Sequence, residues 1–245
     1  MIRNLDKPVV LNAKEKEQFV HEIFSAIACR YDWLNSILSL KLDFFWRRYA
    51  VAKATVPADG KALDLCCGTG KLTLELVKAV GVGGSVIGVD FCANMLQIAR
   101  ANISKTGYVD NVTFVEANAL ELPFADNFFD CCTVGFGMRN VADIPRAVSE
   151  IHRVLKTGGR LVILELGKPS MPVFRSLYFF YFEKILPVLG QALTKVKGAY
   201  QWLPDSLRLF PDQQEVVRML KENGLKDVGR DNLTGGIVAV YFGVK

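Results

Sequence analysis

Short apolar runs alternate with amphipathic segments through the middle of the chain. Each run has the length of a buried strand, and each segment repeats its apolar residues at helical spacing. The pattern predicts strands at 62–66, 85–89, 112–116, 130–134 and 160–165, with helices at 71–79, 92–106 and 143–155. Strands that alternate with helices build a mostly parallel sheet with right-handed crossovers. We therefore expect an α/β fold.

The last third of the chain predicts two further strands and one more helix. Asp212 and Glu215 have the spacing of a capping box, and Gly224 is suited to follow the end of the helix that they begin. The runs 225–231 and 237–242 read as strands, which brings the expected sheet to seven.

The first 55 residues predict a helical cap. Apolar residues recur at helical spacing over 14–27 and 44–53. Between these helices, Tyr31, Asp32 and Asn35 place polar groups in an aromatic-rich stretch. They either belong to a cap that simply packs on the sheet edge, or project into a ligand pocket, since buried polar groups need partners.

An aromatic-dense segment, Phe174–Phe182, interrupts the alternating pattern and continues into an apolar stretch. We consider three interpretations for 170–200: packing in the core, a wall for a lipid-like substrate, and a segment lying in a membrane interface. A hydrophobic substrate would favour the last two together.

The loop after the first strand carries the main binding motif. Glycines stand at 68 and 70, after Asp64, and Asp90 ends the next strand, where an acid can accept hydrogen bonds from both ribose hydroxyls. The third glycine of a dinucleotide fingerprint is missing, which argues against a nucleotide-binding oxidoreductase. The loop resembles motif I of the class I S-adenosylmethionine methyltransferases, where glycines let the ligand approach the backbone.

The polar candidates converge on one edge of the expected sheet. Ligands of parallel sheets bind beyond the carboxyl ends of the strands, where the glycine loop, Asp90, Asn118 and the loop 135–140 all fall. In that last loop, Arg139 is a permanent cation with several donors, suited to hold a phenolate or enolate oxygen. The alternative is that Arg139 ties its own loop to a nearby carboxylate.

Composition narrows the class of protein. Of the 245 residues, 51% are hydrophobic, and the formal net charge of +5 could favour an anionic membrane surface but shows no clustered nucleic-acid stripe. Six cysteines without a C-x-x-C, and two histidines, predict no metal site and small buried thiols of a reducing compartment. No signal-peptide core and no spanning run is seen, so we expect a cytoplasmic protein, soluble or peripheral at the inner face of the membrane.

Four separated motifs resemble one family closely. They look like signatures of the ubiquinone/menaquinone biosynthesis C-methyltransferases (UbiE/MenG), and the resemblance runs from about residue 15 to the end of the chain. The motifs are Phe24–Asn35, Phe136–Val141, Leu203–Gln213 and Asn232–Ile237.

The resemblance implies a Rossmann-like class I methyltransferase fold with a mostly parallel seven-stranded sheet and an antiparallel edge strand. It divides the chain into an N-terminal helical cap, 1–55, and an S-adenosylmethionine-dependent domain, 56–245, with a hydrophobic helical insertion at 170–200. The implied activity is C-methylation of a polyprenyl quinol ring, from demethylmenaquinol to menaquinol or on the related benzoquinol.

The resemblance also assigns roles to residues. The cofactor site is expected at Asp64, Gly68, Thr69, Gly70, Asp90, Asn118, Ala119 and Gly135, with Asp90 on the ribose and Asn118–Ala119 near the adenine. Many members have a serine at the place of Gly135, so that hydroxyl contact is lost here, and Lys71 stands where an acidic or polar residue is common. For catalysis we expect Arg139 to stabilise the developing phenolate, Asn140 and Tyr31 to orient the ring or a water that takes the proton, and Asp32 to be the alternative base.

Other functions stay open at this point. Fold alone does not separate quinol methylation from C-methylation of another hydrophobic small molecule. A non-catalytic S-adenosylmethionine-binding scaffold is the alternative outside the enzymes. The sequence leaves naphthoquinol against benzoquinol, prenyl length and the general base undecided, and it is compatible with a homodimer.

Overall fold

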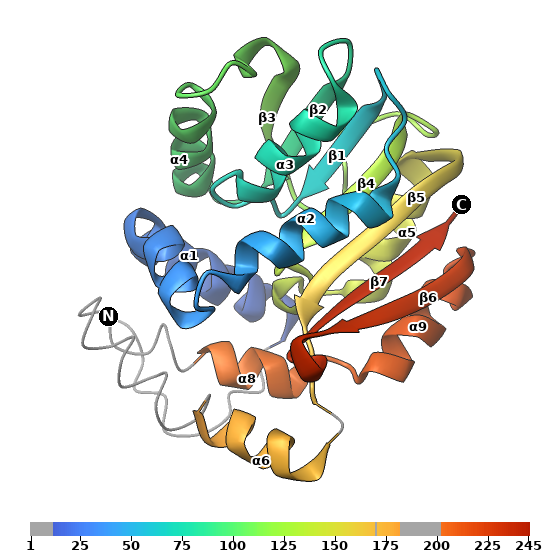
Figure 1. Ribbon diagram of the computed structural model, residues 1–245. Helices are drawn as coiled ribbons and strands as arrows, with labels where there is room; N and C mark the ends of the chain where they lie inside the picture. Colours follow the sequence, from blue (N-terminus) through green and yellow to red (C-terminus); the bar gives the residue numbers. More distant parts are fainter. Residues whose placement is uncertain (1–11, 170, 182–201) are drawn as a thin grey trace.

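The computed structural model describes residues 12–169, 171–181 and 202–245. Figure 1 shows a central sheet with helices on both sides and a group of helices beside one end of the strands. The sheet comprises β1 (Lys61–Leu65), β2 (Ser85–Asp90), β3 (Val112–Glu116), β4 (Phe129–Gly135), β5 (Leu155–Leu166), β6 (Lys226–Leu233) and β7 (Val238–Val244). The helices are α1 (Ala13–Leu38), α2 (Leu42–Ala54), α3 (Lys71–Val80), α4 (Ala93–Ile103), α5 (Ile144–Val154), α6 (Pro172–Phe180), α8 (Trp202–Leu209) and α9 (Gln213–Glu222).

The seven strands follow the order β3-β2-β1-β4-β5-β7-β6. The first five pair in parallel, with Leu63 of β1 between Ile87 and Cys132. β7 runs antiparallel to both of its neighbours, with β6 outside it at this end of the sheet. The predicted mostly parallel sheet with an antiparallel strand near its edge is confirmed, and every predicted strand is present.

Two layers of helices bury the faces of the sheet. α2 and α3 pack on one face through Trp46, Ala50, Leu76 and other apolar side chains. α5 and α9 cover the other face, where Ile151 and Leu220 join the larger apolar cluster. Short three-residue 3-10 turns complete the connections at Val109–Asn111, Met138–Asn140 and Thr234–Gly236.

The first helix is longer than the pattern predicts. A capping box at Asn12 and Glu15 starts α1, which continues without a break through the stretch 28–38. Tyr31, Asp32 and Asn35 therefore lie on a helix. The division into a cap, 1–55, and a larger domain stays a prediction, although α2 packs directly against β5.

Three further outcomes concern the second half of the chain. β5 begins at Leu155, five residues before the predicted start, because the pairing with β4 shifts register and accommodates Gly158 at φ +81°. Asp212 caps α9 by accepting bonds from the backbone N–H groups of Gln214 and Glu215. Of the aromatic segment, Tyr178 packs in a cluster with α1, Phe180 is exposed, and the part 182–201 lies outside the described residues. Within the described ranges, no helix combines the length and apolarity that crossing a bilayer requires.

Candidate active site

The loop after β1 leaves an open cradle. Gly68 and Gly70 adopt φ of +54° and +80°, which favour glycine, and a Cβ on Gly68 would meet no atom within 4 Å. Cys66 just before them also has a positive φ, +55°, as does Phe136 at +58° in the facing loop after β4. Such backbone positions in non-glycine residues cost free energy and concentrate at functional sites.

Asp90 closes the other side of this cradle. It ends β2, is 7% exposed, and its Oδ2 accepts a hydrogen bond from the Gly68 N–H over 2.8 Å. Its Oδ1 accepts from the Cys92 N–H at 3.0 Å. Burial raises the pKa of Asp90, while these backbone donors act against that shift. The carboxylate is thus fixed beside the glycine loop, as expected for a ribose acceptor.

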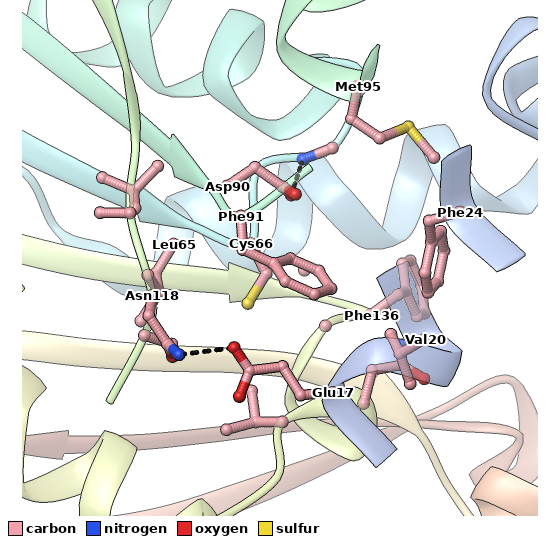
Figure 2. A pocket seen from close by; sticks show the side chains of 18 of the residues that line it. Glu17, Val20, Phe24, Leu65, Cys66, Asp90, Phe91, Met95, Asn118 and Phe136 are labelled. Atoms are coloured by element: carbon pink, nitrogen blue, oxygen red, sulfur yellow. Dashed lines mark hydrogen bonds between the residues drawn. The ribbon is translucent and has the colours of Figure 1, made fainter. Parts of the chain in front are cut away.

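Helix α1 reaches the site from the far side. Figure 2 shows Glu17 of α1 extending to Asn118, whose Nδ2 donates to Glu17 Oε1 over 2.8 Å. Asn118 Oδ1 in turn accepts from the Leu120 N–H. Phe91 lies nearby and stacks edge-on with His21 of α1, the ring centroids 5.5 Å apart. The amide of Asn118 and the ring of Phe91 line the same cavity, and together they are suited to a base.

Three cavities meet at Tyr31. The main cavity has an empty volume of about 740 Å³ and runs from Glu17 and Asn118 past Asp90 to Gly135 and Asn140. The loop cavity, about 330 Å³, lies over the glycine loop and is lined by Tyr31, Arg47, Asp64, Cys66, Cys67, Gly68, Thr69, Lys71, Leu72 and Gly135. The side cavity, about 600 Å³, is lined by Tyr31, Asn35, Leu38, Ser39, Asp43, Trp46, Arg47, Phe136, Arg139, Leu166, Leu203 and Ile237. Most of the predicted site residues line one or more of these spaces.

Asp64 is the most deeply buried acid of the site. It is 0% exposed, and the hydroxyls of Thr73 and Thr133 donate to its two oxygens over 2.6 and 3.1 Å. Burial raises the pKa of Asp64 to about 7, against the effect of these hydroxyls. Its carboxyl group therefore changes charge near neutral pH at the base of the loop cavity.

This shift predicts a pH-dependent stability. Between about pH 4 and pH 7 the folded protein holds a proton on Asp64 that the unfolded chain releases, so raising the pH destabilises the fold through this group. We expect Asp64→Asn to gain about 1–3 kcal/mol in free energy of unfolding, relative to the native chain, between about pH 5 and pH 8. Urea denaturation without ligand, at pH 5 and at pH 8, measures the difference in free energy of unfolding between the variant and the native chain. The exposed Asp110→Asn is the control. A gap that is equal at both pH values would contradict the assignment.

Asp32 has a different place from the one expected of a base. Its Oδ1 accepts a hydrogen bond from Thr69 Oγ1 over 2.6 Å and lies 3.6 Å from Lys71 Nζ. It is absent from the lining of all three cavities. Asp32 therefore ties α1 to the glycine loop, and its role as alternative base stays a prediction that this geometry does not favour.

Arg139 forms a buried ion pair. Its Nη1 donates to Glu165 Oε1 and to the Phe136 carbonyl oxygen, each over 2.6 Å. The backbone N–H of Arg139 donates to Glu165 Oε2. The loop-to-carboxylate tie considered from the sequence is thus present. Arg139 also lines the side cavity, and within the described part of the chain its Nε–H is buried without a hydrogen-bond partner.

Tyr31 and Asn140 both line the main cavity. Burial raises the pKa of Tyr31, and the positive charge of Arg139 acts in the other direction. Asn140 lines the main cavity, and its Oδ1 accepts a hydrogen bond from Trp202 Nε1 over 2.9 Å. That bond orients the amide so that its Nδ2 side is available to a ligand.

Several site residues were missed from the sequence. Glu17 and Arg47 looked like polar positions of amphipathic helices, and Trp202 lay beyond the aromatic segment. Glu165 gave one usable signal, because an acid inside the apolar run of a buried strand requires a partner. Cys66, expected to be a small core thiol, is half-buried and lines both the main and loop cavities.

The residues present fit S-adenosylmethionine. The open space over Gly68 admits a ligand where a Cβ would stand, Asp90 offers a carboxylate beside it, and Asn118 and Ala119 line the distal end of the main cavity. Thr69 lines the loop cavity, while Gly70 supports the loop by its φ rather than by lining. Gly135 lines both cavities without a side chain, so it offers backbone only.

Comparison with known proteins places the chain in a family. Its sequence is 44% identical over 233 residues to the demethylmenaquinone methyltransferase of Shouchella clausii, covering 95% of this chain and 99% of that protein. It is 44% identical over 234 residues to the enzyme of that name from Staphylococcus aureus strain JH9, covering 96% and 95%. A crystal structure of an S-adenosylmethionine-dependent methyltransferase from Aquifex aeolicus shares the fold, with a TM-score of 0.62, 20% identity and coverage of 86% and 97%. Residues 12–245 match the ubiE/COQ5 methyltransferase family, and the chain belongs to that family.

Proposed function

We propose that this protein transfers a methyl group from S-adenosylmethionine to a ring carbon of demethylmenaquinol, a polyprenyl naphthoquinol. The observation that carries this proposal is the state of Arg139, which lines the side cavity and whose buried Nε–H has no hydrogen-bond partner among the described residues. A buried donor without an acceptor costs about 1–3 kcal/mol, which a ligand oxygen would recover. The 44% identity to two proteins named demethylmenaquinone methyltransferases supports the same substrate.

The side cavity suits a hydrophobic ring that carries an oxygen for Arg139 to bind. Its walls include Trp46, Phe136 and Leu203, and it meets the main cavity at Tyr31 and Phe136. A flat ring held there would present its edge to the space beyond Gly135. Aligning two bound reactants in a site closed to water supplies much of the rate enhancement in such reactions.

The residues of the chain divide the work. S-adenosylmethionine supplies an activated methyl group on a sulfonium sulfur. Asp90 holds the ribose, Asn118 and Ala119 the adenine, and the glycine loop the remaining length. Arg139 stabilises the phenolate oxygen of the quinol through its guanidinium charge, which Glu165 holds in place.

The phenolic proton must leave before the ring carbon becomes nucleophilic. Tyr31 and Asn140 orient the ring or a water that takes this proton. Asp43, an acid on the wall of the side cavity, is a weak base, because hydrogen bonds and charge from Arg47 and the charge of Lys71 hold its pKa low despite its burial. The water route is therefore the one that the described residues favour.

An exposed apolar corner adjoins the side cavity and suits a bilayer surface. The last turns of α1, the turn after it and the start of α2 expose Trp33, Ile37, Leu40, Leu42, Phe44 and Phe45, with Leu40 83% exposed. Lys41 and Arg48 are exposed among them, and the Arg48 guanidinium lies 5.5 Å from the Phe44 ring centroid. Leu38, Ser39 and Asp43 of the same corner line the side cavity. A prenyl tail that leaves this cavity would enter a membrane directly, so we infer peripheral attachment here.

Membrane binding tests this corner. Phe44→Ser/Phe45→Ser is expected to reduce co-sedimentation with anionic liposomes about tenfold or more, since each buried aromatic side chain contributes about 1.5–3 kcal/mol. Binding of the native chain should weaken with salt. The control replaces exposed Val82 and Val109, which precede β2 and β3 at the opposite end of the strands. Equal loss in both variants, or no binding by the native chain, would contradict the surface.

A methyl-transfer assay tests the function itself. Purified protein receives methyl-labelled S-adenosylmethionine and a short-chain demethylmenaquinol kept reduced, with a matching benzoquinol in parallel. We expect label on the naphthoquinol ring carbon, and label on both would widen the substrate range. Cofactor binding without any labelling would favour another hydrophobic substrate or the scaffold alternative. The homodimer stays a prediction.

A further inference from the structure

We propose that Arg47 and Lys71 form the recognition site for the carboxylate of the cofactor's methionine moiety, in the loop cavity. The inference rests on the proposed function only through its cofactor. It concerns two residues of this chain, one overlooked in an amphipathic helix and one noted as a departure from the family pattern.

The loop cavity continues the path of the main cavity. The two share Tyr31, Cys66, Gly68 and Gly135. Because Asp90 is bonded to the Gly68 N–H, a ligand with its ribose at Asp90 has the rest of its length over the glycine loop. The amino-acid end of such a ligand therefore lies in the loop cavity.

The charges around the loop cavity match that end. Its lining holds two cations, Arg47 and Lys71, and one acid, Asp64. The carboxyl group of Asp64 accepts hydrogen bonds from two threonine hydroxyls, and its pKa is about 7. An α-amino acid offers one carboxylate and one ammonium group, so the two cations can take the first and Asp64 can face the second.

Contacts with residues that do not line the loop cavity hold both cations in position. Arg47 is 8% exposed, and its Nη1 lies 2.5 Å from Asp43 Oδ2, which is 3.9 Å from Lys71 Nζ. Lys71 Nζ also donates to Ser36 Oγ over 3.2 Å and to the Asp32 carbonyl oxygen over 3.3 Å. Asp43 faces neither the main nor the loop cavity. Asp32 Oδ1 lies 3.6 Å from Lys71 Nζ, so two acids accompany the two cations. Neither Asp32 nor Asp43 lines the loop cavity, whereas Arg47 and Lys71 both do.

The planar fork of Arg47 suits this ligand. A guanidinium can bind a carboxylate through two parallel N–H groups. It has five N–H donors on three nitrogens, so Arg47 keeps donors for a ligand while Nη1 is bonded to Asp43. The guanidinium carbon also lies 5.5 Å from the centroid of the Phe136 ring, a contact that helps to hold it in place. Lys71, at the first residue of α3, adds a point charge on the same side as the helix N-terminus.

Two ligands separate this role from general stability. Isothermal titration calorimetry without quinol compares S-adenosylhomocysteine with its decarboxylated analogue, which keeps the amine but lacks the carboxylate. In the native chain the first should bind about 10- to 100-fold more tightly, as charge-assisted hydrogen bonds allow. In Arg47→Gln and in Lys71→Gln this ratio should fall at least threefold, mainly through weaker binding of S-adenosylhomocysteine.

The controls decide every outcome. Arg47→Lys keeps the charge and should restore part of the ratio, and Lys78→Gln, at an exposed position of α3, should leave it unchanged. If Arg47→Gln and Lys71→Gln both kept the native ratio, or weakened the two ligands equally, the assignment would be overturned. If Arg47→Gln fails to fold, Lys71→Gln decides alone. Binding with a normal ratio but no quinol methylation would reject the proposed substrate and leave this inference standing.

Discussion

Glu165→Gln is expected to lower the free energy of unfolding by about 3 kcal/mol, a loss typical of broken buried ion pairs. The carboxylate accepts bonds from Arg139 Nη1, the Arg139 N–H and the Leu166 N–H, over 2.6, 3.1 and 2.8 Å. An amide has one oxygen and one NH₂ group, so either orientation points a donor at a donor. Arg139 would also keep a buried charge without its counter-ion.

Urea denaturation at neutral pH measures this loss. The matched control is Glu222→Gln on α9, because its partner Arg218 is 3.7 Å away and both side chains are more than 60% exposed, at 67% and 66%. Exposed pairs contribute about 0–1 kcal/mol, so the control should remain close to the native chain. Similar losses in the two variants would show that the buried pair has no special role.

Arg139→Gln is expected to reduce kcat for naphthoquinol methylation by about a hundredfold to a thousandfold, the usual cost of removing a donor from a developing oxyanion. Because Arg139 lines the side cavity and neither cofactor cavity, the Kd for S-adenosylhomocysteine should stay within about threefold of the native value. Stopped assays with saturating reduced quinol measure kcat, and calorimetry measures Kd.

A second variant separates chemistry from folding in this case. Arg139→Gln/Glu165→Gln removes both charges, so it should recover part of the stability lost in Glu165→Gln while turnover stays low. Turnover that returns with stability would mean that Arg139 serves the loop and not the reaction. Native-like turnover in the single variant would lead to the same conclusion.

The sequence predicts best those parts whose cause is local. Most of the strands are predictable because a buried strand is a largely apolar run, although β6 is polar and only partly buried. The glycine loop is predictable because left-handed φ angles select glycine. Asp90 and Asn118 follow from chain order, since parallel strands bring their carboxyl ends to one edge. These residues needed no knowledge of what packs against them.

The remaining site residues depend on contacts between distant segments. Asn118 bonds to Glu17 across 101 positions, and Asn140 to Trp202 across 62. No periodicity within one helix distinguishes Glu17 or Arg47 from solvated polar positions. The role of Asp32 as alternative base stays a prediction, but its contacts with Thr69 and Lys71 could not be read from its position in the sequence. Partners, and not residue types, decide these roles.

Helix α1 has a consequence for how the two substrates affect each other. The same unbroken helix supplies Glu17, which bonds to Asn118 in the main cavity, and Tyr31 at the junction of the three cavities, about 21 Å apart at 1.5 Å per residue. A ligand that fixes one end of a stiff helix also orders its other end. Cofactor and quinol should therefore bind with positive heterotropic cooperativity, and thermodynamic linkage requires each to strengthen the other by the same factor.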